Sequence, residues 1–405
     1  MQTPPADRAM LPVAAALSAT AAWNLTAMGA DADGLAHALG TGLGAVGLIG
    51  ALLWLAHAIS QLPAGWMIER YGTRAVGALA AAGMLACNLL SAIEPDAIAL
   101  GATRLVAGFF CGTGAVCAVM VARGRTAVGQ GLVGGATSAG AAAPLALVPA
   151  LEPLLGWRAP FVLGAVPAAL MLPALAAVHD VRAPLRAAHR AATGLRSLLA
   201  DDVLLRLSAL LAAQTVLSWT MGNWIVLLLD RDGRFSSVVA GLLGALVFAG
   251  GIVARPLGAW ITASTRVSAN VLIGACLLGG SAAVGVIAAG APPWVLGLAI
   301  AGLGLTASMP WAVILHAAGV ARPHDAAAGV GMVGSGGTLA ACASIPLFGV
   351  AFDTGHETLA LVCLAVLAAC SVLVLPVVRA QEPTLSAATE SSLAGLGSDR
   401  SASRP

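Results

Sequence analysis

The most informative segment of this chain is Gly65-Trp66-Met67-Ile68-Glu69-Arg70-Tyr71-Gly72-Thr73-Arg74. It is a short charged segment between two long apolar runs, 40–62 and 75–93. Gly72 permits a tight turn, and Gly65 lets its helix approach a neighbour closely. Glu69 can pair with arginines or sit near a helix N-terminus, where the helix dipole favours a negative charge. The stretch therefore predicts a compact charged turn between two apolar helices.

The composition of the whole chain indicates a membrane protein. Of its 405 residues, 59% are hydrophobic and only 9% are charged, whereas a soluble domain carries about 25% charged residues. Lipid permits only helices or closed barrels, because backbone polar groups must pair internally there. The apolar runs are about 20 residues long without period-two alternation, which favours helices. A net charge of +2 gives no reason to expect a nucleic-acid partner.

Charged and proline-containing segments divide the chain into about twelve predicted spans in an all-α membrane fold with two pseudo-symmetric six-helix bundles. We expect an N-terminal six-helix half over 1–180, a cytoplasmic linker over 181–203, a C-terminal half over 204–380 and a disordered cytoplasmic tail over 381–405. The predicted spans are 10–30, 40–62, 75–93, 97–121, 129–151, 159–178, 204–229, 238–260, 268–289, 293–318, 326–350 and 358–378.

The placement of arginine, the only basic residue type besides histidine, predicts the orientation. With both termini in the cytoplasm, only Arg158, Arg231 and Arg234 fall in outside loops. Because basic residues favour the cytoplasmic side, we expect a multi-pass protein of the inner (plasma) membrane. Fifteen arginines then fall inside: Arg8, Arg70, Arg74, Arg123, Arg125, Arg182, Arg186, Arg190, Arg196, Arg206, Arg266, Arg322, Arg379, Arg400 and Arg404.

An internal repeat supports two related halves. Pro63-Ala64-Gly65-Trp66-Met67-Ile68 ends the second predicted span, and Pro256-Leu257-Gly258-Ala259-Trp260-Ile261 ends the eighth. Both segments place Pro-x-Gly before a tryptophan and an isoleucine. A parallel duplication of six-helix halves is the architecture of one large transporter class.

The charged stretch resembles the signature loop of the major facilitator superfamily, Gly-x-x-x-(Asp/Glu)-Arg-x-Gly-x-Arg. A second resemblance is Arg104 followed by Gly108 in the fourth predicted span. Together they imply alternating access, with the loop latching the cytoplasmic side when the transporter opens outward. The motif residues carried over as gating or structural are Gly65, Glu69, Arg70, Gly72, Arg74, Arg104 and Gly108. In the second copy of the loop Thr262 replaces the acid, so a latch there is weaker.

A narrower resemblance is to the nitrate/nitrite porter branch. It lies in Gly250-Gly251-Ile252-Val253-Ala254-Arg255 and in the glycine-rich fifth and eleventh spans. That branch also has an arginine in the second span, where this chain offers Gln61 instead. Half of the expected anion clamp is therefore absent.

Ionisable residues inside predicted spans are costly and usually functional. They are Arg104, Arg255, His57 and His316, with no acidic residue. Fixed positive charge without a carboxylate favours an anionic substrate. We therefore assign Arg255 to substrate binding. The competing interpretation is that the Arg255 side chain snorkels to the lipid headgroups. His57 and His316 are candidates for carrying a coupled proton, although a lone helix histidine more often packs or hydrogen-bonds.

Four further residues are candidates for substrate binding: Gln61 in the second span, and Asn24, Asn223 and Trp311. The last three fall in spans 1, 7 and 10, which line the cavity in the superfamily that the chain resembles. A tryptophan can equally be an interfacial anchor.

The leading functional prediction is a secondary active transporter that moves a small solute, a nitrate/nitrite-like or organic anion, by alternating access. The alternative is proton-coupled efflux of drugs or metabolites, which is weakened by Ala141 after Gly140, where efflux antiporters carry Gly-Pro. A membrane receptor explains neither the duplication nor the charged turn. We predict no enzymatic activity, no cofactor and no metal, since the seven cysteines lie in apolar runs without Cys-x-x-Cys spacing. The expected partners are the substrate, a coupled proton or counter-anion, and lipid, around a monomer.

Overall fold

The computed structural model describes residues 10–93, 96–123, 127–178, 195–322 and 326–375. Within these ranges the regular elements are helices and no strand occurs, as expected for an all-α membrane protein. The helices are α1 (Met10–Thr26), η1 (Ala27–Asp31), α2 (Ala32–Leu39), α3 (Leu43–Tyr71), α4 (Thr73–Ile93), α5 (Ala97–Arg123), α6 (Ala127–Leu155), η2 (Gly156–Arg158), α7 (Ala159–Ala176), α8 (Leu195–Leu199), α9 (Asp202–Thr215), η3 (Val216–Thr220), α10 (Met221–Arg231), α11 (Ser237–Ser264), α12 (Ala269–Ala288), α13 (Pro293–Ser308), α14 (Pro310–Ala321), α15 (Ala326–Asp353), α16 (Glu357–Cys370) and η5 (Ser371–Val374).

Eleven segments of the described chain are long and apolar enough to cross a membrane. One of them, Gly131–Ala176, has 46 residues and contains α6, η2 and α7. The turn in it follows Gly156, whose φ of 58° is in the left-handed region that favours glycine. The predicted spans 129–151 and 159–178 both fall largely within this segment.

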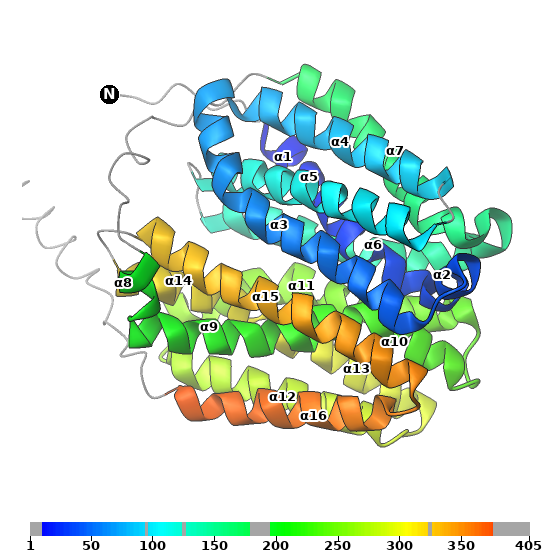
Figure 1. Ribbon diagram of the computed structural model, residues 1–405. Helices are drawn as coiled ribbons and strands as arrows, with labels where there is room; N and C mark the ends of the chain where they lie inside the picture. Colours follow the sequence, from blue (N-terminus) through cyan, green and yellow to red (C-terminus); the bar gives the residue numbers. More distant parts are fainter. Residues whose placement is uncertain (1–9, 94–95, 124–126, 179–194, 323–325, 376–405) are drawn as a thin grey trace, which may run out of the picture.

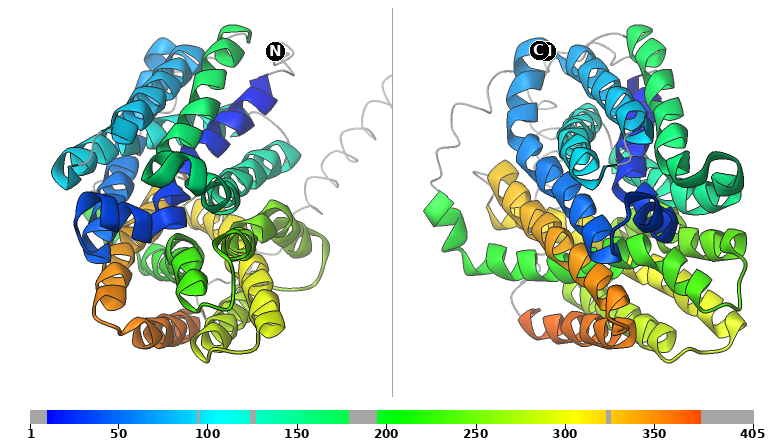
Figure 2. Two further views of the ribbon diagram at one scale, coloured as in Figure 1. Left: turned by 90° about the vertical axis from the view of Figure 1, so that its right-hand side faces the viewer. Right: turned by 45° about the vertical axis from the view of Figure 1, so that its right-hand side comes forward.

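The helices form two groups that lie side by side (Figure 1). Helices α1–α7, the N-terminal group, occupy the upper part of the view, and α8–α16, the C-terminal group, occupy the lower part. We call the right-hand end of Figure 1 the α2 end and the left-hand end the α8 end. Figure 2 (left) looks onto the α2 end, where the two groups again lie one above the other. The long helices run between these two ends, so each residue can be placed by its distance from them.

The charged stretch at 65–74 is more helical than the sequence predicts. Helix α3 continues past Pro63 to Tyr71, and α4 begins at Thr73. Gly72 alone separates them, with a φ of 86°, so the tight turn expected there is confirmed. Arg70 lies in the last turn of α3, where the helix dipole favours a positive charge, and this helps the helix to extend beyond its apolar run.

An ion pair and a hydrogen bond of Arg322 join α8 to the rest of the C-terminal group at the α8 end. Arg322, which follows α14, donates from Nε to the Asp201 carboxylate at 2.9 Å and from Nη1 to Ser197 of α8 at 3.2 Å. Asp201 also caps α9 by accepting from the backbone amides of Val203 and Leu204. Desolvation raises the pKa of Asp201, but the hydrogen bonds from Arg322 and these amides outweigh it and hold the pKa below its ordinary value.

Candidate functional site

The two helix groups are joined at the α2 end by side chains that cross between them. Asp353, the last residue of α15, accepts hydrogen bonds from the backbone amides of Leu43 and Gly44 at the start of α3, both at 2.8 Å. A carboxylate at a helix N-terminus pairs otherwise unsatisfied amides and is favoured by the helix dipole. Arg231 of α10 adds an ion pair with Asp33 of α2, at 2.7 Å. The α2 end of the interface is therefore closed by specific polar contacts.

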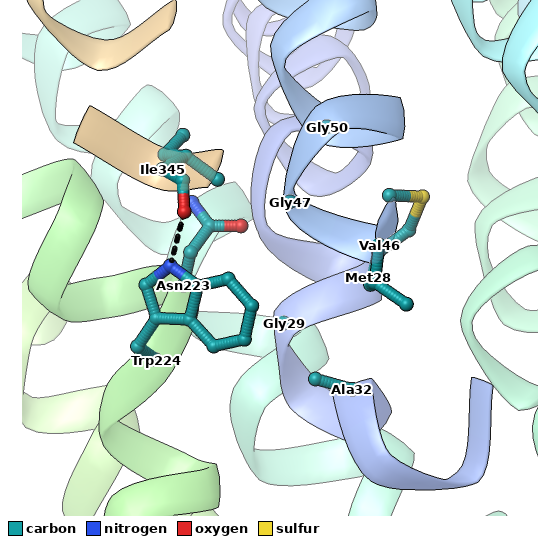
Figure 3. A pocket seen from close by; sticks show the side chains of 9 residues that line it. All are labelled: Met28, Gly29, Ala32, Val46, Gly47, Gly50, Asn223, Trp224 and Ile345. Atoms are coloured by element: carbon teal, nitrogen blue, oxygen red, sulfur yellow. Dashed lines mark hydrogen bonds between the residues drawn. The ribbon is translucent and has the colours of Figure 1, made fainter. Parts of the chain in front are cut away.

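Little space remains between the groups behind these contacts. A cavity of about 10 Å³ is lined by residues of both groups, including Met28, Gly47 and Asn223, and has room for about one water molecule. Figure 3 shows Asn223 and Trp224 of α10 facing α3 across it. Asn223 donates to Leu25 O of the N-terminal group at 3.3 Å, and Trp224 donates to Ile345 O at 3.1 Å. Asn223 thus lies at the interface, on its closed side.

An aromatic layer crosses the interface nearer the middle of the helices. Trp54 of α3 packs edge-on against Trp219, with ring centroids 4.9 Å apart, and Trp219 packs against Phe248 of α11 at 4.8 Å. His57 lies 5.9 Å from Trp54. Trp219 belongs to η3, a single π-helical turn between α9 and α10, a distortion that is frequent at functional sites. Within the described chain, Trp54 Nε1 and His57 Nδ1 are buried without a hydrogen-bond partner.

Arg255 lies on the α8 side of this layer, at the same interface. It is seven residues after Phe248 in α11, about 10 Å farther along the helix. Its side chain is buried, its Nη1 donates to Gly134 O of α6 at 3.2 Å, and its guanidinium carbon lies 4.9 Å from the centre of the Trp311 ring. The structure thus brings two of the predicted residues, Arg255 and Trp311, into contact between the helix groups.

The α8 end differs from the α2 end along the pair α3 and α15. Near the α2 end these helices touch, since a Cβ at Gly47 would lie 2.7 Å from the Pro346 backbone. Toward the α8 end a Cβ at Gly65, Gly331 or Gly334 would meet no atom of the described residues within 4 Å. The close helix approach expected at Gly65 is therefore not made with any described residue in this conformation. Figure 1 shows α3 and α15 converging at the α2 end and separating toward the α8 end.

Two charged residues of the turn, Glu69 and Arg70, have surroundings that differ from the expected latch. Among the described residues, Glu69 forms no ion pair, so the pairing with arginines expected for it is not made here. Arg70 instead lies over the rings of Trp66 and Tyr71, 5.7 and 5.6 Å from their centres. Arg74, on α4, is exposed.

Arg104 and Asn24 form a separate buried cluster inside the N-terminal group. Arg104 Nη1 donates to the side-chain oxygens of Asn24 at 3.3 Å and Asn88 at 3.1 Å, and Nη2 donates to Cys87 O at 2.9 Å. Its guanidinium also stacks on Phe161. The cluster ties α1, α4, α5 and α7 together, so Asn24 faces the interior of one group and does not face the interface.

The remaining predicted residues are dispersed. Gly108 allows close contact of α5 with Leu53 O of α3. Gln61 is half-buried on α3, and His316 is exposed on α14. The sequence does not indicate that Trp54 contacts Trp219, or that Ser138 of α6 lies at the interface. The signal for Trp54 and Trp219 was present as two aromatic residues near the middle of spans 2 and 7, but their contact depends on how the groups dock.

Comparison with known families is decisive for the class of protein. The sequence model of the Major Facilitator Superfamily matches residues 13–345. This chain belongs to the Major Facilitator Superfamily. It is therefore a multi-pass membrane protein of a transporter family and not an enzyme. The resemblance based on the stretch 65–74 is confirmed, whereas the match does not address the nitrate/nitrite branch.

Solved structures share the fold at low sequence identity. A D-xylose-proton symporter is 14% identical, with a TM-score of 0.73, over 91% of this chain and 97% of the other. A point mutant of the nucleoside transporter NupG is 13% identical, with a TM-score of 0.75, over 92% and 99%. A POT family transporter in complex with 5-aminolevulinic acid is 14% identical, with a TM-score of 0.68, over 90% and 95%. No curated protein sequence matches significantly.

Proposed function

We propose that this superfamily member is a secondary active transporter that moves a small anion by alternating access, with Arg255 binding the substrate. The proposal is based mainly on the guanidinium of Arg255, which is buried between the two helix groups and has no carboxylate partner among the described residues. Every described acidic residue lies within four residues of a helix end or just outside a helix. A positive charge buried within the membrane-spanning part of the protein attracts anions and disfavours organic cations.

The position of Arg255 also favours substrate binding over snorkelling. A snorkelling arginine directs its guanidinium toward lipid headgroups and water. Arg255 is 6% exposed and its hydrogen bond reaches Gly134 on the opposite helix group. A ligand held at this point contacts both groups at once, as alternating access requires of a central site.

We propose twelve spanning helices in two six-helix halves, with both termini and the linker 181–203 in the cytoplasm. At 1.5 Å per residue, a 46-residue segment would be about 69 Å long, roughly twice the thickness of the hydrocarbon core. The turn after Gly156 lets that segment cross twice as α6 and α7, which turns eleven segments into twelve spans. In this orientation the separated α8 end of α3 and α15 faces the cytoplasm.

Uptake into proteoliposomes tests the proposed substrate class. We expect accumulation of at least one labelled anion among nitrate, formate, acetate and lactate. Arg255→Gln should abolish it, and Arg255→Lys should weaken it about 10- to 100-fold, because lysine keeps the charge but loses a charge-assisted hydrogen bond worth about 1.5–3 kcal/mol. The matched control is Arg206→Gln, which removes an exposed arginine paired with Asp202 at the α8 end and should leave uptake unchanged.

Two results would contradict this proposal. One is wild-type apparent affinity in Arg255→Lys, as expected for an arginine that only reaches headgroups. The other is a transported substrate that proves to be an organic cation. Neither result would alter the family assignment.

A further inference from the structure

Helices α6 and α11 meet across the two groups in successive contacts that are one helical turn apart. In one contact Arg255 Nη1 donates to Gly134 O at 3.2 Å. In the next, a Cβ at Gly251 would lie 2.6 Å from Ser138 Oγ. Gly134 and Ser138 are four residues apart, as are Gly251 and Arg255, so each pair shares one helix face. Ser138 is therefore about 5–6 Å along the interface from the contact made by Arg255.

Both polar side chains are buried with unused hydrogen-bonding capacity. Ser138 is 1% exposed, and its Oγ has no hydrogen-bond partner anywhere in the described chain. Arg255 is 6% exposed, and its Nε likewise has none among those residues. Leaving buried donors unpaired costs free energy, and two such donors on facing helices at adjacent turns suggest a ligand that pairs them.

The free edge of the Arg255 guanidinium indicates the geometry of that ligand. Gly134 O occupies Nη1, and the Trp311 ring lies against the guanidinium. The edge that remains carries Nε–H and the neighbouring Nη2–H. This edge forms two parallel hydrogen bonds with a planar group that presents two oxygens on one side.

We infer that Ser138 completes an oxyanion site with Arg255. The Nε/Nη2 edge of Arg255 holds two oxygens of a planar oxyanion, a carboxylate or nitrate, and the Ser138 hydroxyl donates to one of them. An anion that is hydrogen-bonded to both residues bridges the distance of about 5–6 Å between the two contacts, and so links α11 to α6. Since both donors are covered in this conformation, the anion enters when the groups part at this interface. The inference rests on the proposed anion transport and specifies the substrate as a planar oxyanion, a carboxylate or nitrate.

Thermal unfolding of the purified full chain in detergent tests this site without transport. The probes are sodium formate, acetate and nitrate, with sodium chloride at equal ionic strength as the reference. We expect at least one oxyanion to raise the unfolding temperature above the chloride value. Formate and acetate report a carboxylate site, and nitrate reports a nitrate site. The apparent Kd should weaken about tenfold or more in Ser138→Ala, and binding should be lost in Arg255→Gln.

The unfolding temperature without anion separates a binding role from a structural one. Removing a buried hydroxyl that has no partner breaks no hydrogen bond, so anion-free Ser138→Ala should unfold at the wild-type temperature or higher. The matched control is Ser18→Ala, which removes a buried serine hydroxyl bonded to Thr137 at 2.7 Å within the N-terminal group. It should keep the wild-type anion affinity.

Each contrary result has a separate meaning. Wild-type affinity in Ser138→Ala, or a lowered anion-free unfolding temperature, overturns the role of Ser138 and leaves the proposed function standing. Binding that survives in Arg255→Gln overturns both the site and the anion proposal. Wild-type protein that responds to all three oxyanions as it does to chloride overturns the oxyanion site, and uptake into proteoliposomes then decides the proposed function independently.

Discussion

Two buried arginines show how residue partners determine what an intramembrane charge can do. Arg104 uses both terminal nitrogens on side-chain and backbone oxygens of its own helix group. With the described residues Arg255 makes one hydrogen bond, and that bond crosses to the other group. The first arginine therefore fastens helices within a group, whereas the second lies where relative movement of the groups changes its surroundings.

The sequence identified both arginines as intramembrane charges but could not assign these partners. Asn24 was predicted to line a cavity, yet its side chain accepts from Arg104 inside the group. Helices that are apolar on every side carry no clear periodic signal for which face points inward. For the same reason Ser138 and the contact of Trp54 with Trp219 become visible only in three dimensions.

Glu69 provides a prediction at the scale of a single residue. Glu69→Ala should abolish or strongly reduce uptake, because the resembled motif uses this acid to hold the cytoplasmic side closed in the opposite conformation. Expression and thermal stability should stay close to wild type, since Glu69 makes no ion pair with the described residues in this conformation. Uptake and unfolding temperature measured on the same preparation check both parts.

The control for Glu69 is another carboxylate at the α8 end. Asp202 pairs with Arg206 one turn later on α9, at 2.9 Å, and its side chain is 69% exposed. An exposed pair of this kind contributes little, so Asp202→Ala should transport normally. If Glu69→Ala behaves like Asp202→Ala, the charged turn has no gating role.

At the scale of helices, the sequence predicts the elements better than their ends. The apolar runs locate the long helices, but α3 extends nine residues beyond the predicted span 40–62 because its charged last turns stay helical. The tenth predicted span, 293–318, is divided at Met309 into α13 and α14, directly before Pro310. Proline lacks a backbone N–H, and it is tolerated as the first residue of a new helix.

The pair α3 and α15 carries a prediction about closure of the α2 end. Asp353→Ala removes the carboxylate that caps α3 from the opposite group, and loss of such a cap costs about 0.5–2 kcal/mol. We expect the α2 end to open more often. Spin labels on the exposed residues His37 of α2 and Thr358 of α16 should then report a longer or broader distance by double electron–electron resonance.

Asp96 offers a matched control for this closure. It lies just before α5 and accepts from the amides of Ile98 and Ala99, both at 2.9 Å, but these contacts stay within the N-terminal group. Asp96→Ala should lower the unfolding temperature without changing the distance between the labels. An unchanged distance in Asp353→Ala as well would show that its contact with α3 does not hold the groups together.

At the scale of the whole molecule, the family could be predicted from the sequence, but the way in which the two helix groups pack against each other could not. The stretch 65–74 and the repeat at 256–261 predicted a superfamily whose sequence model matches residues 13–345. Which end of the interface is closed depends on contacts such as those of Asp353 with α3 and Arg231 with Asp33. These residues are 310 and 198 positions from their partners, and no local pattern relates them.

The orientation of the whole molecule gives the last prediction. The turns at the α8 end contain arginines such as Arg70, Arg74, Arg266 and Arg322, whereas those at the α2 end contain Arg158, Arg231 and Arg234. Basic loops are retained on the cytoplasmic side during insertion, so the α8 end should face the cytoplasm. Reporter fusions at Gln381 and near Arg190 should read cytoplasmic, and one near Asp232 should read external. An external reading at Gln381 would require an odd number of spans if the N-terminus is cytoplasmic, and would reject the twelve-helix arrangement.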